Sequence, residues 1–128
     1  MVVIILIFSG NWILAQEKMA EIIDPVIKTI QEGDAGRLAA YFNVTVELQL
    51  PDHENTYSSS QGEMIMKDFF KKYPPDSFSV IQKGTTDTAS RFAICDYLSG
   101  IKKYQVYIYL KKEKEEFLIH KITFEEKK

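Results

Sequence analysis

The sequence contains a single cysteine, Cys95. A disulfide within the chain is therefore excluded, and the stability of the fold has to come from a packed hydrophobic core. The net charge is also small, because 16 basic residues nearly balance 18 acidic residues. A surface that binds a polyanion needs an excess of basic side chains, so nucleic acid is not an expected partner.

Residues suited to a metal or cofactor site are few. His53 lies between Asp52 and Glu54, but one histidine and two carboxylates in a polar loop are not a specific ligand set. Cys95 has no sequence cue for an activating base, and we interpret it as a small, half-buried hydrophobic side chain. We therefore expect no metal, no cofactor and no catalytic residue that the sequence alone can assign.

One long apolar run is present, from Val2 to Phe8. It is too short to cross a bilayer core of about 30 Å, and Ala15 supplies a small residue for cleavage before Gln16. The sequence thus predicts a signal peptide over 1–15 and one domain over 16–128, exported to the periplasm or secreted, with no stable membrane span after cleavage. No Lys or Arg precedes the run, so two alternatives stay open: a longer natural leader, or an interfacial or core segment.

Helix and strand signals follow in a clear order. Asp24-Pro25 begins a helix that Gly33 ends, and Asp34 caps a second, short helix. Apolar residues alternate from Val44 to Leu50, which predicts a strand, and the polar stretch 52–59 predicts a loop. Ser60 to Glu63 matches a capping box for a further helix, which the prolines after Tyr73 end.

The remainder predicts four antiparallel strands over 78–83, 88–98, 103–111 and 117–125. With 45% hydrophobic residues, including seven Tyr and eight Phe, the chain can fill one core. Helices that precede a meander of strands are typical of an α+β fold with the helices on one face of the sheet.

A set of packing and capping residues extends over roughly 24–125 and consists of Gly33, Asp34, Ala35, Leu38, Tyr41, Phe42, Ser58, Gln61, Ile65, Asp68, Phe69, Phe70, Phe78, Val80, Lys83 and Gly84. This set resembles a Bacteroidetes family of small exported proteins, domain of unknown function 4783. The order of elements resembles the nuclear transport factor 2-like, or cystatin-like, cone. The resemblance implies N-terminal helices packed on a curved antiparallel sheet, and it implies little about function.

The side chains that share one face of the predicted sheet indicate a pocket. A three-residue turn from Ser99 to Ile101 would set Asp96 opposite Tyr104, and the last strand would then carry His120 on the same inner face. In a cone fold that face lines the pocket. Asp96 and His120 would lie beside positions about 13 Å apart, so they could not form a direct pair, and a bound small molecule would have to bridge them.

The outer face is predicted to carry more aromatic surface than a solvated sheet needs, through Tyr97, Tyr107, Tyr109 and Phe117. Exposed apolar patches often mark interfaces, so we expect a homodimer through this face.

Two classes of function remain open. The favoured one is a non-enzymatic binding or assembly module of the cell envelope, with its cone plugged by Phe69, Phe70 and Phe78. The alternative is a small-molecule enzyme of the ketosteroid-isomerase-like kind, with Asp96 or His120 as general base and Tyr104 as oxyanion donor.

Overall fold

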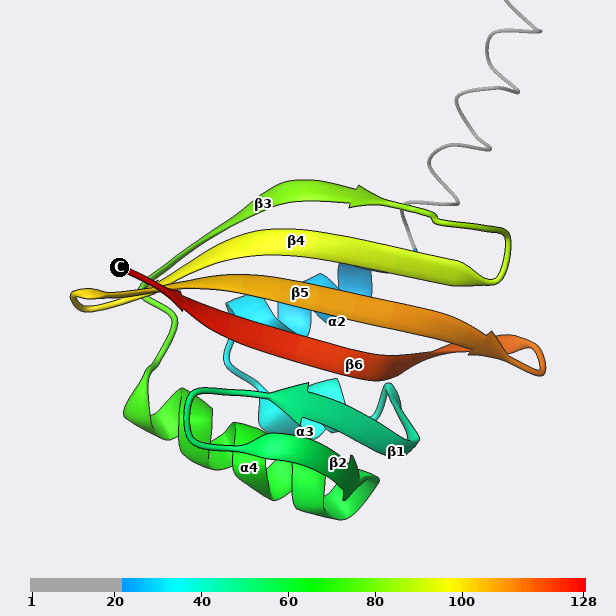
Figure 1. The fold of residues 1–128 in the computed structure, drawn as a ribbon, viewed down its shortest axis with the longest axis horizontal. Helices are drawn as coiled ribbons and strands as arrows, with labels where there is room; N and C mark the ends of the chain where they lie inside the picture. Colours follow the sequence, from blue (N-terminus) through cyan, green and yellow to red (C-terminus); the bar gives the residue numbers. More distant parts are fainter. Residues whose placement is uncertain (1–21) are drawn as a thin grey trace, which may run out of the picture.

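The computed structural model describes residues 22–128, so the predicted signal peptide over 1–15 lies outside the described residues. A curved six-stranded sheet forms the centre of the domain, and helix α2 lies behind β4 and β5 in the view of Figure 1. The elements are α2 (Asp24–Gln31), α3 (Ala35–Ala39), β1 (Phe42–Gln49), β2 (Glu54–Ser58), α4 (Ser59–Lys72), β3 (Ser77–Gly84), β4 (Ser90–Ser99), β5 (Lys102–Glu113) and β6 (Glu116–Lys127). The predicted α+β class is confirmed.

Helices α3 and α4 begin where a side chain satisfies free amide groups, whereas α2 follows Ile23 with no side-chain cap. Pro25 occupies the first turn of α2, and the Asp34 side chain accepts a hydrogen bond from the Arg37 amide at 3.0 Å at the start of α3. A capping box does start α4, but Ser58 and Gln61 form it, two residues earlier than predicted. Helix α4 ends at Lys72, as the prolines after Tyr73 predict.

The stretch predicted as a polar loop contains strand β2. Strand β2 pairs antiparallel with β1, from Thr45 opposite Ser58 to Gln49 opposite Glu54, and α4 begins directly after it. The prediction missed β2 because four of its five residues are exposed and it shows no apolar alternation. The hairpin places α4 against β1 and β2.

The sheet order is β2-β1-β6-β5-β4-β3. All neighbouring pairs are antiparallel except β1 and β6, which run parallel. The pairing register shifts at three places, in β1–β6, β3–β4 and β5–β6, and such bulges bend a sheet. The first shift leaves Val44 82% exposed, although the alternation from Val44 to Leu50 predicted it to face inward.

The core fills the space between the helices and the concave face of the sheet. Its largest fully buried side chains include Ile30 of α2, Leu38 of α3, Met66 of α4 and Ile108 of β5. An ion pair of 2.6 Å between Lys83 Nζ and Asp24 Oδ1 joins β3 to the start of α2. Within residues 22–128, no helix is long and apolar enough to cross a membrane.

Helix α4 approaches β1 closely at Gly62. A Cβ atom at this position would lie 3.0 Å from Val46 Cγ1 and 3.1 Å from Phe42 Cε2. Both of those side chains are buried, so they would have to give way by a few tenths of an ångström to accept even an alanine.

We predict opposite effects of alanine at two helical glycines. Gly62→Ala should lower the free energy of unfolding by about 1–2 kcal/mol, because overpacking outweighs the gain in helix propensity. Gly36→Ala, whose Cβ would meet only Asp34 Oδ1 at 3.7 Å, should raise it by up to about 1 kcal/mol. Urea unfolding followed by circular dichroism measures both. An increase in both variants would contradict the close approach of α4.

Candidate functional site

The turn between β4 and β5 decides which residues enter the cone. Ser99 pairs with Lys102, so the turn has two residues, Gly100 and Ile101, and not the three predicted. Gly100 has a φ of +60°, as a two-residue hairpin with glycine in first position needs. Tyr97, and not Asp96, lies opposite Tyr104.

This register corrects the predicted positions of Asp96 and Tyr97. Asp96 lies on the outer face, where its Oδ1 accepts a hydrogen bond of 2.9 Å from Lys127 Nζ. Tyr97 was predicted on the outer face, but it is fully buried inside the cone. A turn one residue shorter moves each β4 side chain to the opposite face of the sheet.

A bulge in the last strand corrects the positions of His120 and Phe117 in the same way. Leu110 pairs with Ile119 and Tyr109 pairs with Lys121, which leaves His120 as the extra residue. His120 Nε2 therefore lies 3.1 Å from Glu113 Oε1 at the end of the β5–β6 hairpin and does not enter the cone. Phe117 was predicted on the outer face, but it packs against the core.

The cone interior is filled by aromatic rings, which we call the aromatic plug: Phe69, Tyr73, Tyr97, Tyr104 and Phe124. The Phe69 ring of α4 is central, with its centroid 4.6 Å from that of Phe124, 5.5 Å from Tyr104 and 5.4 Å from Tyr73. The Tyr97 hydroxyl donates a hydrogen bond to the Tyr73 carbonyl, which ties β4 to the end of α4.

Two other phenylalanines were expected in such a plug. Phe70 is buried beside Phe69, with ring centroids 6.2 Å apart, and Phe78 of β3 is partly buried against the core. Tyr104 is buried on the inner face, as predicted. Burial, and then the neighbouring Tyr73, raises the pKa of the Tyr104 hydroxyl. Asp96 and His120 do not join it, so the predicted group of three inward polar residues is wrong.

Cys95 is likewise a core residue. It pairs with Val106 and is fully buried, more deeply than the half-buried position predicted. Burial, with a smaller contribution from Asp96, raises the pKa of the thiol from 9.0 to about 11, so the thiolate needed for nucleophilic chemistry does not form near neutral pH. Within residues 22–128, no group of three or more His, Cys, Asp and Glu side chains is placed to hold a metal ion.

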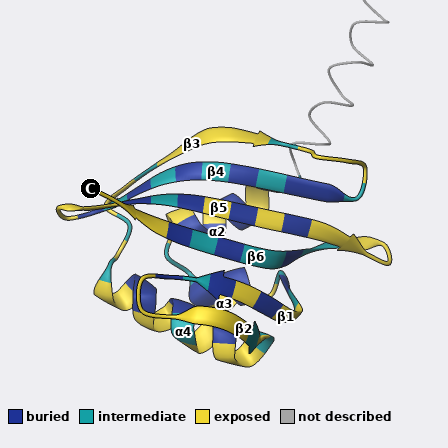
Figure 2. Cartoon of the chain, viewed as in Figure 1, coloured by how far each residue is buried: buried dark blue, intermediate teal, exposed yellow. Residues whose placement is uncertain are grey.

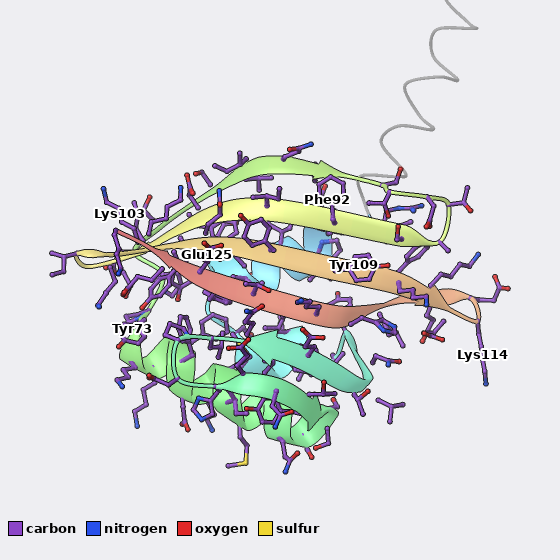
Figure 3. The ribbon with its side chains drawn as sticks, in the orientation of Figure 1. Tyr73, Phe92, Lys103, Tyr109, Lys114 and Glu125 are labelled. Atoms are coloured by element: carbon purple, nitrogen blue, oxygen red, sulfur yellow. The ribbon has the colours of Figure 1, made fainter. Side chains whose placement is uncertain are left out.

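The outer face of the sheet carries four neighbouring apolar side chains, which we call the outer patch: Phe92, Ile94, Tyr107 and Tyr109. Phe92 pairs directly with Tyr109 and Ile94 with Tyr107, and Figure 3 shows Phe92 on β4 and Tyr109 on the neighbouring strand β5. Tyr107 and Tyr109 alternate with buried residues along β5, as Figure 2 shows. Tyr107 and Tyr109 are 36% and 37% exposed, which agrees with the prediction that they face outward.

Sequence reasoning missed Phe92 and Ile94 as members of this patch. The assumed three-residue turn placed both of them inside the cone. The signal that could have found them was Gly100, since a glycine followed by one residue also fits the shorter hairpin turn.

Comparison with known proteins agrees with this architecture. A family model described as Domain of unknown function (DUF4783) matches residues 23–125. The crystal structure of a DUF4783 family protein from Bacteroides ovatus is 24% identical, covers 82% of this chain and 94% of its own, and has a TM-score of 0.76. No curated protein matches the sequence.

More distant structures share the fold alone. A domain of unknown function with a cystatin-like fold from Nostoc punctiforme is 11% identical, with a TM-score of 0.64, and the match covers 88% of this chain and 77% of that one. A ketosteroid isomerase-like protein from Erwinia carotovora atroseptica is 10% identical, with a TM-score of 0.68 and coverage of 86% and 94%. The nuclear transport factor 2-like, or cystatin-like, cone predicted from the sequence is confirmed.

We predict that the buried thiol makes the fold sensitive to alkali. Because the pKa of Cys95 is about 11 in the folded chain and 9.0 is its ordinary value, the unfolded chain loses this proton first as the pH rises. The free energy of unfolding should therefore fall above pH 9, by about 1.4 kcal/mol per pH unit for one proton. Urea unfolding between pH 7 and pH 10 measures the slope, which Cys95→Ala should flatten. An equal slope in this variant would contradict the assignment.

Proposed function

This chain belongs to the family described as Domain of unknown function (DUF4783), and on that premise we propose that it is an exported, non-enzymatic binding or assembly module of the cell envelope. It acts as a homodimer whose protomers meet through the outer face of the sheet. The observation that carries this proposal is the outer patch, because Tyr107 and Tyr109 stay exposed on the outer face while the rings of the aromatic plug fill the cone interior.

The shape of the outer patch suits a second copy of the same chain. A shallow hollow of about 290 Å³ lies over β4, β5 and β6 and is lined in part by Phe92, Tyr107 and Tyr109. A two-fold dimer places the same patch on both sides of the interface, so a tyrosine of one protomer can enter the hollow of its partner. Tyrosine is enriched at such contacts because its ring is apolar and its hydroxyl stays hydrated.

Two lysines beside the patch are already paired with carboxylates of the same protomer. Lys121 Nζ lies 2.9 Å from Glu47 Oε2 on one side, and Lys127 Nζ lies 2.9 Å from Asp96 Oδ1 on the other. A partner of strong opposite charge would gain little from this face. A second copy brings the same balanced rim and no repulsion.

The three residues that the enzymatic alternative requires lie apart from one another. Asp96 is paired with Lys127 on the outer face, His120 lies beside Glu113, and Tyr104 is packed within the aromatic plug. A general base and an oxyanion donor have to reach one substrate. The filled cone therefore favours the binding module over an enzyme of the ketosteroid-isomerase-like kind.

The support for export comes from the start of the sequence. The apolar run from Val2 to Phe8 and the small residue Ala15 fit a cleavable leader, and the family match begins after it, at residue 23. A sheet surface that self-associates fits an assembly role outside the cytoplasm.

We predict that the chain sediments as a dimer at micromolar concentration and that Tyr109→Glu makes it a monomer. The substitution sets a carboxylate near its symmetry mate in an apolar contact, which should weaken the dimer at least tenfold. Ile101→Glu is the matched control, because Ile101 is a 96% exposed apolar residue at a hairpin tip. It should leave the dimer intact.

Two results would contradict the dimer. One is a monomer at all concentrations for the unmodified chain, and the other is a dimer that Tyr109→Glu leaves unchanged. Circular dichroism of each variant checks that the fold is retained.

For export, we predict that the chain recovered from the cell envelope or the medium of a Bacteroides host begins at Gln16. Mass spectrometry of the intact protein measures the cleavage point. Ala15→Asp should leave the leader attached, because a charged residue does not satisfy the small-residue requirement at the site. Recovery of the uncleaved chain from the cytoplasm would contradict export.

A further inference from the structure

A cavity of about 240 Å³ lies where the β1–β2 turn meets the C-terminal end of α4. The turn contributes residues 50–53, and the helix contributes residues from Ile65 to Tyr73. The cavity lies on the helical side of the sheet, away from the outer patch, and Figure 3 shows Tyr73 at that end of α4. It is therefore separate from the proposed dimer face.

The floor of the cavity is apolar and firmly packed. Leu50 and Phe69 are both buried core residues, and Ile65 packs partly buried beside them. Phe69 is also the central ring of the aromatic plug, with Phe124 at 4.6 Å behind it. A floor held in this way keeps its shape without a ligand, so little ordering is needed on binding.

The rim of the cavity carries more negative than positive charge. Its two carboxylates are Asp52 from the turn and Asp68 from the helix, and its basic groups are Lys72 and the imidazole of His53, which carries no charge when neutral. Lys72 Nζ lies 3.9 Å from Asp52 Oδ2 and 5.6 Å from the centroid of the Tyr73 ring. Asp68 makes no ion pair with any residue in 22–128, so one carboxylate at the rim is free to meet a cation.

We propose that this cavity binds a small organic amine, whose ammonium ion meets Asp68 and Asp52 and whose short apolar body rests on Phe69, Leu50 and Ile65. Lys72 Nζ now lies over the Tyr73 ring, so a ligand ammonium that displaces Lys72 gains a cation–π contact with the same ring. The size sets the class of ligand: cavities of about 300–1,000 Å³ take drug-sized molecules, so 240 Å³ suits a smaller one.

Three probes of matched size and different charge test the proposal: 2-phenylethylammonium, 2-phenylethanol and phenylacetate. Each is titrated into the isotopically labelled chain at pH 7, and the amide shifts of residues 50–53 and 65–73 are followed by nuclear magnetic resonance. The ammonium probe should shift these amides, should bind at least tenfold more tightly than the alcohol, and should weaken as salt is added. Phenylacetate should not bind.

Charge variants assign the contact to the rim. Asp68→Asn should weaken the ammonium probe about tenfold, the loss of one charge-assisted hydrogen bond, and Lys72→Met should strengthen it, because it removes the competing cation. Glu115→Gln is the control, since Glu115 is an exposed acid in the β5–β6 turn, and it should change nothing. Nα-acetyl-lysine methylamide is titrated as well, to compare a lysine side chain with a free amine as the source of the ammonium ion.

Several outcomes would overturn the proposal. These are equal affinity for the ammonium and the alcohol, preference for phenylacetate, shifts that map outside residues 50–53 and 65–73, or an unchanged affinity in Asp68→Asn. The dimer test uses Tyr109 on the opposite face, so the two proposals can fail separately.

Discussion

The packing of Phe69 against the rings of Tyr104 and Phe124 holds helix α4 to the sheet. The Phe69 ring meets that of Tyr104 edge to face and that of Phe124 at a tilt, and together the rings fill the concave space inside the cone. The outer patch depends on the same contact, because each strand that turns one side chain into the plug turns the next one outward. The cavity at the end of α4 depends on it too, because Phe69 forms part of its floor.

The sequence predicted the fold through features that act over a few residues. Asp34 and the prolines after Tyr73 satisfy or block helical hydrogen bonds locally, so a prediction needs no tertiary contact. The facing of β5 was also predictable, since its residues from Tyr104 to Leu110 alternate without interruption. Strand β2 escaped prediction because its stability comes from pairing with β1 and not from burial of its own side chains.

The candidate site was less predictable because it depends on register. A glycine turn of two residues and one of three both fit the sequence around Gly100, and the difference of one residue reverses the facing of Asp96 and Tyr97. The bulge at His120 likewise reverses the facing of residues in β6, and no local sequence pattern predicts this bulge. Tyr107 and Tyr109 were placed correctly because no such shift separates them from the rest of β5.

The parallel pairing of β1 with β6 has a consequence for how the domain assembles. Strand β6 lies between β1 and β5, so the β1–β2 hairpin, with α4 packed against it, cannot join the other strands until residues 116–127 have been synthesised. The contacts between β1 and β6 form late and slowly, because the long stretch of chain between the two strands has to close first. During synthesis the first half of the domain therefore stays without its hydrophobic partner, and a ribosome that stops before β6 leaves a chain that proteases can recognise as incomplete.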